Sequence, residues 1–518
     1  MWNFLPYFLY YSITKRRKNL FFKVIMSKKI IVIGSGFAGL SAACHLAQAG
    51  YDVTVLEKNA DLGGRAREFS AEGFRFDMGP SWYWMPDVFD SFFANFGKKT
   101  SDYYELNRLS PSYKVVFDTK ESVDIPADYG ALRDMFESYE TGAAAQLDAF
   151  MDDASYKYEV GIKDFVYRPS RSVFEFTDMR FFKGLVQLDL LSSFSKLARK
   201  HFKNEKLLQI IEFPVLFLGA TPENTPAMYS LMNYADLKLG TWYPKGGMHE
   251  IIKAMVSLAR ELGVQFETNV EVAKIKIKND IVTGIETTED IFYTADAVLA
   301  GADYHHVEQQ LLPKAYRQYS PEYWDKRTMA PSSLLFYIGV NKRIKNLLHH
   351  NLFFDADFAL HAKEIYDTPK LPTRPLFYVS CPSQTDSTVA PEGMENIFLL
   401  MPTPPDLPLT KADYEHYFDV MMQRLEAFTG ENITEHIVYK RGFAHAEFIK
   451  EYHSYKGNAY GLANTLMQTA LLKPSLKNPK LKNLYFAGQL TVPGPGVPPS
   501  LISGEVVARE LMKEQKLV

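Results

Sequence analysis

The chain has 518 residues and a formal net charge of −3; 47% of its residues are hydrophobic and 14% are aromatic. This length favours about three domains, or two large ones, with ample core, and the charge gives no reason to expect a nucleic-acid partner. Its two cysteines, Cys44 and Cys381, argue against a disulfide framework, a structural zinc site or a Cys-x-x-Cys redox motif, and they suit a reducing cytosol.

The first 25 residues form an unusual N-terminal extension. An aromatic stretch from Trp2 to Tyr11 precedes a basic run at Lys15–Lys18, whereas a secretory signal carries its positive charges first. The apolar stretch is also shorter than the about 20 residues that cross a bilayer. Met26 stands directly before the first expected strand, so we hypothesise that it is the natural start and that residues 1–25 are not native. No later apolar run has transmembrane length, which favours a soluble or peripheral protein.

Residues 29–58 have the pattern of a dinucleotide-binding βαβ unit. The β-branched run Ile30–Ile33 predicts a buried strand, and Gly34, Gly36 and Gly39 follow it at GxGxxG spacing before a small-residue helix. The first glycine allows a tight turn, the second lets the backbone approach a pyrophosphate, and the third lets helix and strand pack closely. Glu57 ends the second expected strand about 20 residues further on, where a carboxylate holds a ribose hydroxyl.

The segment after this unit indicates which dinucleotide is bound. Gly63–Ala66 followed by Gly73–Pro80 resembles the second signature of the FAD-dependent amine oxidase and carotenoid desaturase superfamily. The resemblance implies that Gly63, Gly64 and Arg65 line the flavin side of the pyrophosphate. We therefore expect FAD as cofactor and no metal ion.

Three later segments resemble the parts of this superfamily in which the FAD domain resumes. Residues 263–275 read as strand-turn-strand, and the resemblance places the backbone of Val270–Val272 at the adenine. Residues 296–303 and 483–489 read as strands that end at glycines, and a helix is expected from about Pro499 to Lys513. The resemblance implies that the start of this helix faces the flavin ring, where its dipole stabilises negative charge on the reduced ring.

These considerations give one set of expected FAD-binding residues. The set is Gly34, Gly36, Phe37, Ala38, Gly39, Glu57, Lys58, Gly63, Gly64, Arg65, Ala66, Gly79, Pro80, Ser81, Val272, Gly488 and Val497.

The expected fold is α/β, a Rossmann-type FAD-binding domain of the amine oxidase and carotenoid desaturase superfold with an inserted α+β substrate domain. The FAD-binding domain is expected to be discontinuous, over residues 26–110, 230–310 and 470–518. Residues 110–230 and 310–470 are then the inserted substrate and membrane-associating domain, with boundaries that vary by a few residues.

Residues 181–203 combine an apolar stripe with a basic C-terminal half. Phe181, Leu185, Leu188, Leu191 and Phe194 recur at helical spacing, as in an interfacial helix whose apolar face enters lipid. The same pattern is typical of an ordinary amphipathic helix that covers a core. Both interpretations stay open at this point.

Further motifs resemble the bacterial-type phytoene desaturase family, in order and spacing, from Met26 to about Lys513. They are Tyr243–Met248, Leu347–Asn351, Cys381–Gly393 and Asn483–Gly488, together with Met78–Pro86 near the cofactor. In place of the family's glycine-rich run near the C-terminus, the chain has the proline-containing sequence Val492–Leu501. We expect a stiffer turn there, beside the flavin.

The resemblance implies desaturation of phytoene toward lycopene, with hydride transfer to flavin N5 and loss of a proton from the neighbouring carbon. Phytoene and partly desaturated carotenoids are then the substrates, in a long apolar channel, and the membrane surface is a partner because such substrates dissolve only in lipid. The chain carries no second GxGxxG for a nicotinamide, so oxygen or a quinone is the expected electron acceptor. The expected location is the cytoplasm, at the inner face of the membrane.

Three alternatives remain: desaturation of a hydroxylated or shorter carotenoid, an amine oxidase, and a non-catalytic prenyl-lipid carrier. No catalytic residue can be assigned from the sequence. His349 and His350 are adjacent in an expected strand, where neighbouring side chains face opposite ways, and a structural role is favoured for them. The same applies to His305 and His306, which open a helix after Asp303.

Overall fold

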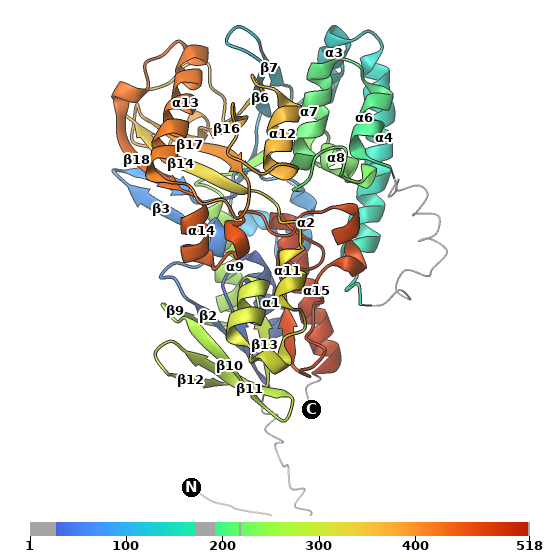
Figure 1. The fold of residues 1–518 in the computed structure, drawn as a ribbon, viewed down its shortest axis with the longest axis vertical. Helices are drawn as coiled ribbons and strands as arrows, with labels where there is room; N and C mark the ends of the chain where they lie inside the picture. The colour runs from blue at the N-terminus through green and yellow to red at the C-terminus, as the bar shows by residue number, and fades with distance from the viewer. Residues whose placement is uncertain (1–26, 172–191, 217–218, 516–518) are drawn as a thin grey trace, which may run out of the picture.

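The computed structural model describes residues 27–171, 192–216 and 219–515. The hypothesis about Met26 and the N-terminal extension, and most of the apolar stripe of residues 181–203, lie outside the described residues. Figure 1 shows two halves along the long axis, each built around its own sheet.

The lower half contains a five-stranded parallel sheet in the order β19-β13-β1-β2-β9. Its strands are β1 (Lys29–Ile33), β2 (Asp52–Glu57), β9 (Gln265–Thr268), β13 (Ala297–Ala300) and β19 (Leu484–Phe486). They come from three separate stretches of the chain, which fall within the segments proposed for a discontinuous FAD-binding domain.

Both faces of this sheet are covered, as its apolar strands require. Ile30 and Val32 belong to the core that includes the helices on one side, whereas Ile31 and Ile33 belong to the core beneath a small antiparallel sheet on the other. The covering elements are α1 (Phe37–Gln48), α9 (His249–Glu261), α15 (Val497–Glu514), β10 (Val272–Lys278), β11 (Ile281–Thr287) and β12 (Phe292–Thr294).

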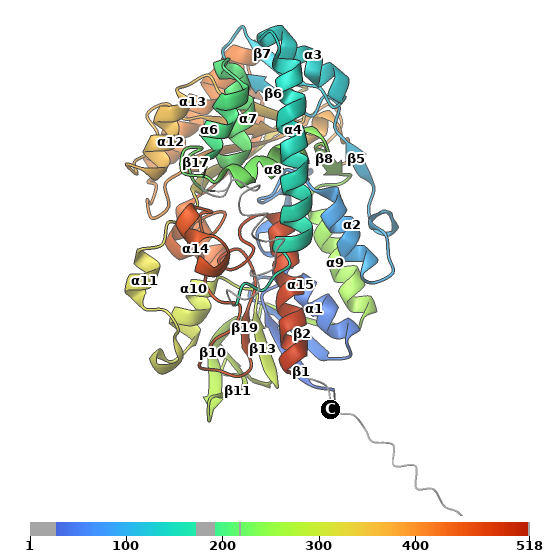
Figure 2. The ribbon, with the colours of Figure 1, turned by 90° about the vertical axis from the view of Figure 1, so that its right-hand side faces the viewer.

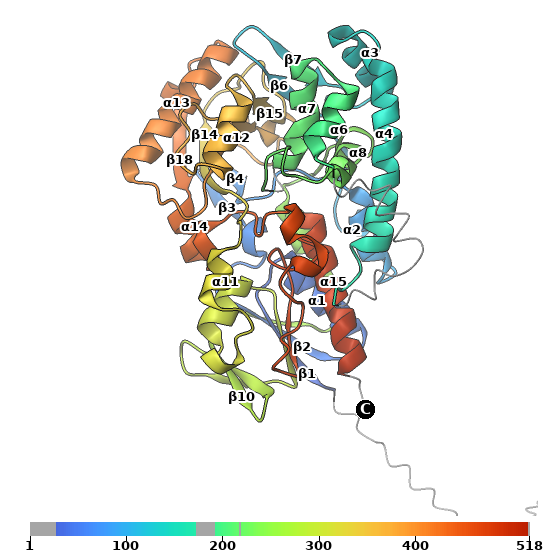
Figure 3. The same ribbon diagram turned by 45° about the vertical axis from the view of Figure 1, so that its right-hand side comes forward.

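Helices α1 and α15 lie side by side (Figure 3). A Cβ atom added to Gly504 of α15 would lie 2.3 Å from the carbonyl oxygen of Ala38, so only a glycine permits this approach. Ser41 fixes the pair by donating a hydrogen bond of 2.7 Å to the carbonyl oxygen of Leu501. As a result, the N-termini of both helices lie close together, at the wall of the same cavity.

The upper half contains a seven-stranded sheet in the order β18-β14-β17-β16-β15-β6-β7, in which only the β15–β6 pair is parallel. Its strands are β6 (Tyr113–Val116), β7 (Ser122–Ile125), β14 (Ser332–Val340), β15 (His350–Phe353), β16 (Phe377–Ser380), β17 (Glu395–Thr403) and β18 (Ile437–Phe443). Leu334, Phe336 and Ile338 pack toward α13, while Leu335 and Tyr337 belong to the central core.

A layer of helices stands beside this sheet. Figure 2 shows α4 extending from this layer down toward α15. The helices are α3 (Tyr129–Tyr139), α4 (Ala143–Val160), α6 (Phe194–His201), α7 (Glu205–Leu216) and α8 (Leu231–Leu237). Helix α8 begins next to the proposed boundary at residue 230 and packs on α4.

Shorter elements connect the two halves or lie at their edges. They are β3 (Glu68–Ala71), β4 (Phe74–Asp77), α2 (Pro86–Ala94), β5 (Leu106–Arg108), β8 (Trp242–Pro244), α10 (Tyr304–His306), α11 (Pro321–Asp325), α12 (Phe358–Tyr366), α13 (Lys411–Thr429) and α14 (His445–Tyr452).

The described end of the 181–203 segment behaves as an ordinary amphipathic helix. On α6 the apolar side chains of Phe194, Leu197 and Ala198 are buried against neighbouring helices, and Lys196 and Lys200 are exposed. Within the described ranges, no helix is both long enough and apolar enough to cross a bilayer.

Candidate cofactor and substrate site

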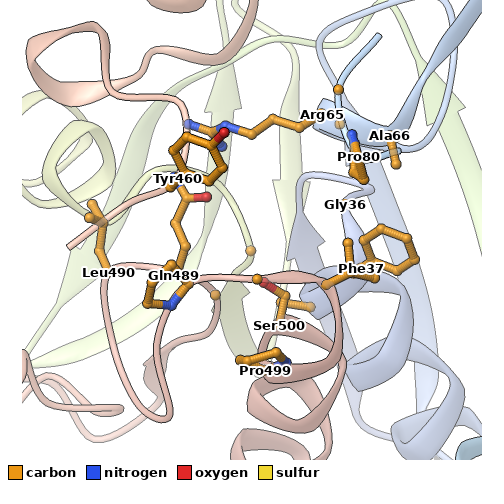
Figure 4. Close-up of a pocket in the computed structure, with 18 of the residues that line it drawn as sticks. Gly36, Phe37, Arg65, Ala66, Pro80, Tyr460, Gln489, Leu490, Pro499 and Ser500 are labelled. Carbon is orange, nitrogen blue, oxygen red and sulfur yellow. The ribbon is translucent and has the colours of Figure 1, made fainter. Parts of the chain in front are cut away.

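A cavity of about 740 Å³ lies where the two halves meet. Its lower walls come from the β1–α1 turn, the end of β2, the segments 63–66 and 78–82, the end of β13 and the loop between β19 and α15. Its upper walls come from the seven-stranded sheet and the helical layer. Figure 4 shows side chains of the lower walls, among them Phe37, Arg65 and Gln489, around one space.

Every residue of the predicted FAD-binding set except Gly39 lines this cavity. Gly39 lies behind the turn, where a Cβ atom would be 2.1 Å from the carbonyl oxygen of Gly34. This close contact between helix and strand is the packing role that its place in the motif predicts.

The glycines at the floor bring two loops almost into contact. Gly63 and Gly64 have φ values of +119° and +57°, and a Cβ atom on Gly64 would lie 3.2 Å from the Cα of Gly36. A Cβ atom on Gly36 would meet no atom within 4 Å, because Gly36 faces the cavity. Among the described residues, no side chain caps the N-terminus of α1 or of α15, and neither first turn contains an acid. The start of α1 therefore has N–H groups available for an anionic ligand. Helix α15 has Pro498 and Pro499 in its first turn, which carry no N–H, so Val497 is the residue there that can donate one.

Glu57 is a buried carboxylate in a fixed position at the end of β2. One oxygen accepts hydrogen bonds from the backbone N–H and hydroxyl of Ser35 at 3.0 and 2.7 Å. The other accepts from the backbone and side-chain nitrogens of Asn59 at 3.0 and 3.1 Å. This carboxylate, held at the cavity wall, suits ribose hydroxyl donors.

Arg65 places a buried guanidinium group in the cavity wall. It donates to the hydroxyl of Ser454 at 2.7 Å. With the amide oxygen of Gln489 facing the guanidinium, that oxygen accepts from Nη1 at 3.1 Å and from Nη2 at 2.8 Å. Figure 4 shows Gln489 and Tyr460 beside this group. Burial lowers the pKa of Arg65, and Asp303 opposes that shift. Its Nε has no hydrogen-bond partner within the described chain, so the site has room for an anion there.

Two histidines that the predicted FAD-binding set did not include, His306 and His453, lie at the Glu57 end of the cavity. The rings of His306 and His453 stack with centroids 3.8 Å apart and planes 4° apart. His453 Nε2 lies 2.8 Å from a carboxylate oxygen of Glu271 and 3.2 Å from Nζ of Lys58. Burial lowers the pKa of His306 to about 3. His305–His306 was visible in the sequence, but no local signal linked either residue to His453.

The rest of the cavity is an apolar chamber. One wall is the inner face of the seven-stranded sheet and the facing walls come from segment 82–85, the turn after α4 and the start of α8. The lining residues there include Trp82, Trp84, Met85, Ile162, Phe165, Met228, Leu231, Met232, Leu335, Tyr378, Phe398 and Leu400. The chamber is continuous with the space beside the glycine turns. An apolar molecule in the chamber would therefore contact a ligand bound at these turns.

The expectation that His349 and His350 face opposite ways is wrong. Their ring centroids are 4.4 Å apart, because β15 begins only at His350 and the alternation of a strand does not extend to His349. Both rings are buried. His305 and His306 lie on α10, with Asp303 accepting a hydrogen bond from the backbone of His306 at 3.1 Å.

The site combines a parallel βαβ sheet, a buried carboxylate at the position that binds ribose in such folds, and helix N-termini without side-chain caps. These features define a dinucleotide-binding protein. The adjoining chamber indicates an apolar substrate. The family described as flavin containing amine oxidoreductase matches residues 37–512. The chain belongs to this family and is an FAD-dependent oxidoreductase.

The chain is also similar to characterised desaturases over nearly its whole length. A carotenoid 3,4-desaturase of Haloarcula japonica is 40% identical over 491 residues, covering 95% of this chain and 99% of that protein. A 4,4'-diapophytoene desaturase of Staphylococcus aureus is 34% identical over 501 residues, with 94% and 99% covered.

Solved structures share the fold at low sequence identity. An oxidoreductase from Methanosarcina mazei matches with a TM-score of 0.61 and 17% identity, over 93% of this chain and 100% of that one. A fatty acid isomerase from P. acnes matches with a TM-score of 0.61 and 16% identity, over 93% and 98%. These likenesses establish the expected α/β architecture.

Proposed function

We propose that this chain desaturates a carotenoid. The observation that carries the proposal is the apolar chamber that opens directly onto the dinucleotide-binding turns. Two relatives of 40% and 34% identity are carotenoid and diapophytoene desaturases, which supports the same substrate class.

The residues present fit FAD, and each has a defined part in holding it. Glu57 would receive the ribose hydroxyls, the N-terminus of α1 and Arg65 would receive the pyrophosphate, and the N-terminus of α15 would face the flavin ring. When bound, FAD supplies a two-electron acceptor for hydride. The chamber holds a hydrocarbon chain in position and excludes water, which is what a substrate without polar groups requires.

Two substrates are the leading candidates. The sequence motifs favour phytoene, converted toward lycopene. The similarity to a carotenoid 3,4-desaturase favours a second candidate, a carotenoid other than phytoene that is desaturated at the 3,4-position. We propose oxygen or a membrane quinone as electron acceptor in either case.

Expression in carotenoid-producing hosts tests the proposal. We expect hosts that accumulate phytoene, diapophytoene or lycopene to form a pigment with longer-wavelength absorption in at least one case, identified by chromatography and mass. Conversion of phytoene supports the first candidate, and conversion only of lycopene or a hydroxylated carotenoid supports the second. Unchanged pigments in every host, from a protein that carries FAD, would exclude carotenoid desaturation.

We further propose that the chain works at the cytoplasmic membrane surface, since its substrates dissolve in lipid. Met467, Leu471 and Leu472 are exposed apolar side chains on one short segment, and Met467 is 73% exposed. Leu471 also lines the cavity. We define Met467, Leu471 and Leu472 as the apolar edge and propose that it docks on lipid beside the chamber.

A further inference from the structure

A tyrosine–histidine pair in the chamber wall lies outside the predicted FAD-binding set. Tyr378 lies on β16 and lines the cavity, while His350 begins the neighbouring strand β15 and is fully buried behind it. The hydroxyl of Tyr378 is 2.6 Å from Nδ1 of His350. The two strands pair in register, with Leu352 opposite Tyr378, so this geometry is fixed by the sheet.

The segment next to the glycine turns reaches the same pair. Trp82 stacks on the ring of His350 with centroids 4.1 Å apart and planes 12° apart. Burial raises the pKa of Tyr378, and the nearby hydroxyls of Ser380 and Ser81 oppose that shift. Because Ser81 and Trp82 directly follow Gly79 and Pro80, the hydroxyl of Tyr378 lies where the expected cofactor site passes into the chamber.

His350 is an uncharged base in a dry environment. Burial lowers its pKa well below 6.5, with a smaller contribution from His349. The ring is therefore neutral at any physiological pH and able to accept a proton. Its Nε2 has no hydrogen-bond partner within the described chain.

We propose that Tyr378 and His350 together take up the proton that desaturation releases, which rests on the proposed function. One C–H bond of the substrate loses its electron pair as hydride to FAD. The neighbouring C–H bond gives its proton to the Tyr378 oxygen, and its electrons form the new C=C bond. The proton that Tyr378 already carries passes to Nδ1 of His350, which becomes imidazolium. A C–H bond beside an electron-poor carbon is a far stronger acid than imidazolium, so a weak base suffices.

A small polar cavity lies beside the pair, and we expect it to receive the proton. A second cavity of about 30 Å³ is lined by Ser81, His349 and Asp77, which is room for a water molecule. The ring of His349 contacts that of His350. Burial raises the pKa of Asp77 to about 7, so its carboxyl group exchanges a proton near neutral pH.

Stopped-flow reduction of the flavin tests the proposal. The FAD-loaded protein is mixed without oxygen with a carotenoid that the wild type converts, and flavin absorbance is followed. We expect Tyr378→Phe and His350→Gln each to slow reduction about 100-fold, the size of a general-base contribution. Carotenoid binding to the FAD-free chain, measured by tryptophan quenching, should change less than about twofold. The slowing of wild-type reduction in D₂O should be absent in both variants, which a merely structural role would not produce.

Matched controls separate proton transfer from packing. Tyr337→Phe removes a buried hydroxyl from the same sheet face, one that donates to the carbonyl oxygen of Met78 at 2.7 Å. His361→Gln replaces another buried histidine, on α12. We expect reduction rates within about threefold of wild type for both. If His350→Gln fails to fold, Tyr378→Phe carries the test, because it removes one oxygen atom only.

The outcomes distinguish this inference from the proposed function. If a carotenoid reduces the wild-type flavin and the reduction rate of Tyr378→Phe is within threefold of the wild-type rate, the proton relay is overturned and desaturation still stands. A wild type whose flavin no carotenoid reduces overturns both.

Discussion

Gly36 and Gly39 lie three residues apart in one turn, but a methyl group added to each would meet different surroundings. Gly36 has φ −70°, which any residue adopts, and faces open space. Gly39 is held against the carbonyl oxygen of Gly34. We therefore expect Gly36 to be required for the ligand and Gly39 for the fold.

We expect Gly36→Ala to fold with a free energy of unfolding within about 0.5 kcal/mol of wild type. Its dissociation constant for FAD should rise about tenfold or more, because the methyl group occupies space at the uncapped end of α1. Calorimetric titration of the FAD-free protein measures this. Gly39→Ala, the matched comparison, should lose about 3 kcal/mol or more, since its contact is with backbone. Wild-type affinity in Gly36→Ala would show that the pyrophosphate lies elsewhere.

At the scale of elements, the buried carboxylate of Asp236 joins α8 to β6. It accepts hydrogen bonds from the hydroxyls of Tyr113 at 2.7 Å and Thr241 at 3.3 Å. Thr241 in turn accepts from the indole of Trp84, which lines the chamber. Burial raises the pKa of Asp236 to about 7, and the two hydroxyls oppose that shift. The helical layer is thus tied to the sheet by a group that titrates near neutral pH.

This pKa predicts a pH dependence of stability. The folded pKa lies above the unfolded value of 3.8, so the contribution to stability is complete below pH 3.8 and is lost as the pH rises to about 7. Over that interval the loss is about 4 kcal/mol. We expect Asp236→Asn to gain stability relative to wild type by up to this amount between pH 4 and pH 8, measured by denaturant unfolding. The exposed Asp134→Asn should show no such trend. A difference between Asp236→Asn and wild type that stays constant with pH would contradict the assignment.

The elements with local signals were predictable from the sequence. Nearby residues alone predict the turn at residues 34–39 and the carboxylate at Glu57. They also predict the two strands that end at residues 300 and 486, shortly before a glycine. The pairing of His306 with His453 and of His350 with Tyr378 depends on which strands and helices become neighbours. Only the family resemblance indicated which distant segments lie close together. It did so for the predicted cofactor residues but not for the pairs in the chamber wall.

For the whole molecule, the position of the apolar edge implies how a lipid-dissolved substrate enters. The edge of Met467, Leu471 and Leu472 lies in the same chain segment as Asn464 and Thr469, which line the cavity. With this edge docked on lipid as proposed, a hydrocarbon leaving the bilayer would enter the protein beside residues that line the cavity.

We expect Met467→Ser combined with Leu472→Ser to reduce recovery with anionic liposomes in a flotation assay at least threefold. The two serines remove apolar surface that would be buried in lipid, and each Å² of it contributes about 25 cal/mol to binding. Leu360→Ser, at an exposed leucine on α12, is the control. Charge reversal at Lys196 and Lys200 tests the alternative that α6 binds the membrane. If the charge-reversed variant no longer floats with liposomes while the serine variants still do, the role of the apolar edge is contradicted.

The pairing of α1 with α15 has a consequence for biogenesis. The first helix of the nucleotide site packs against one completed only at Glu514, so a nascent chain on the ribosome lacks part of the binding surface until synthesis has passed this residue. We therefore expect uptake of the coenzyme only after α15 has been made, and we expect chains that stop short of β19 to emerge colourless and prone to degradation.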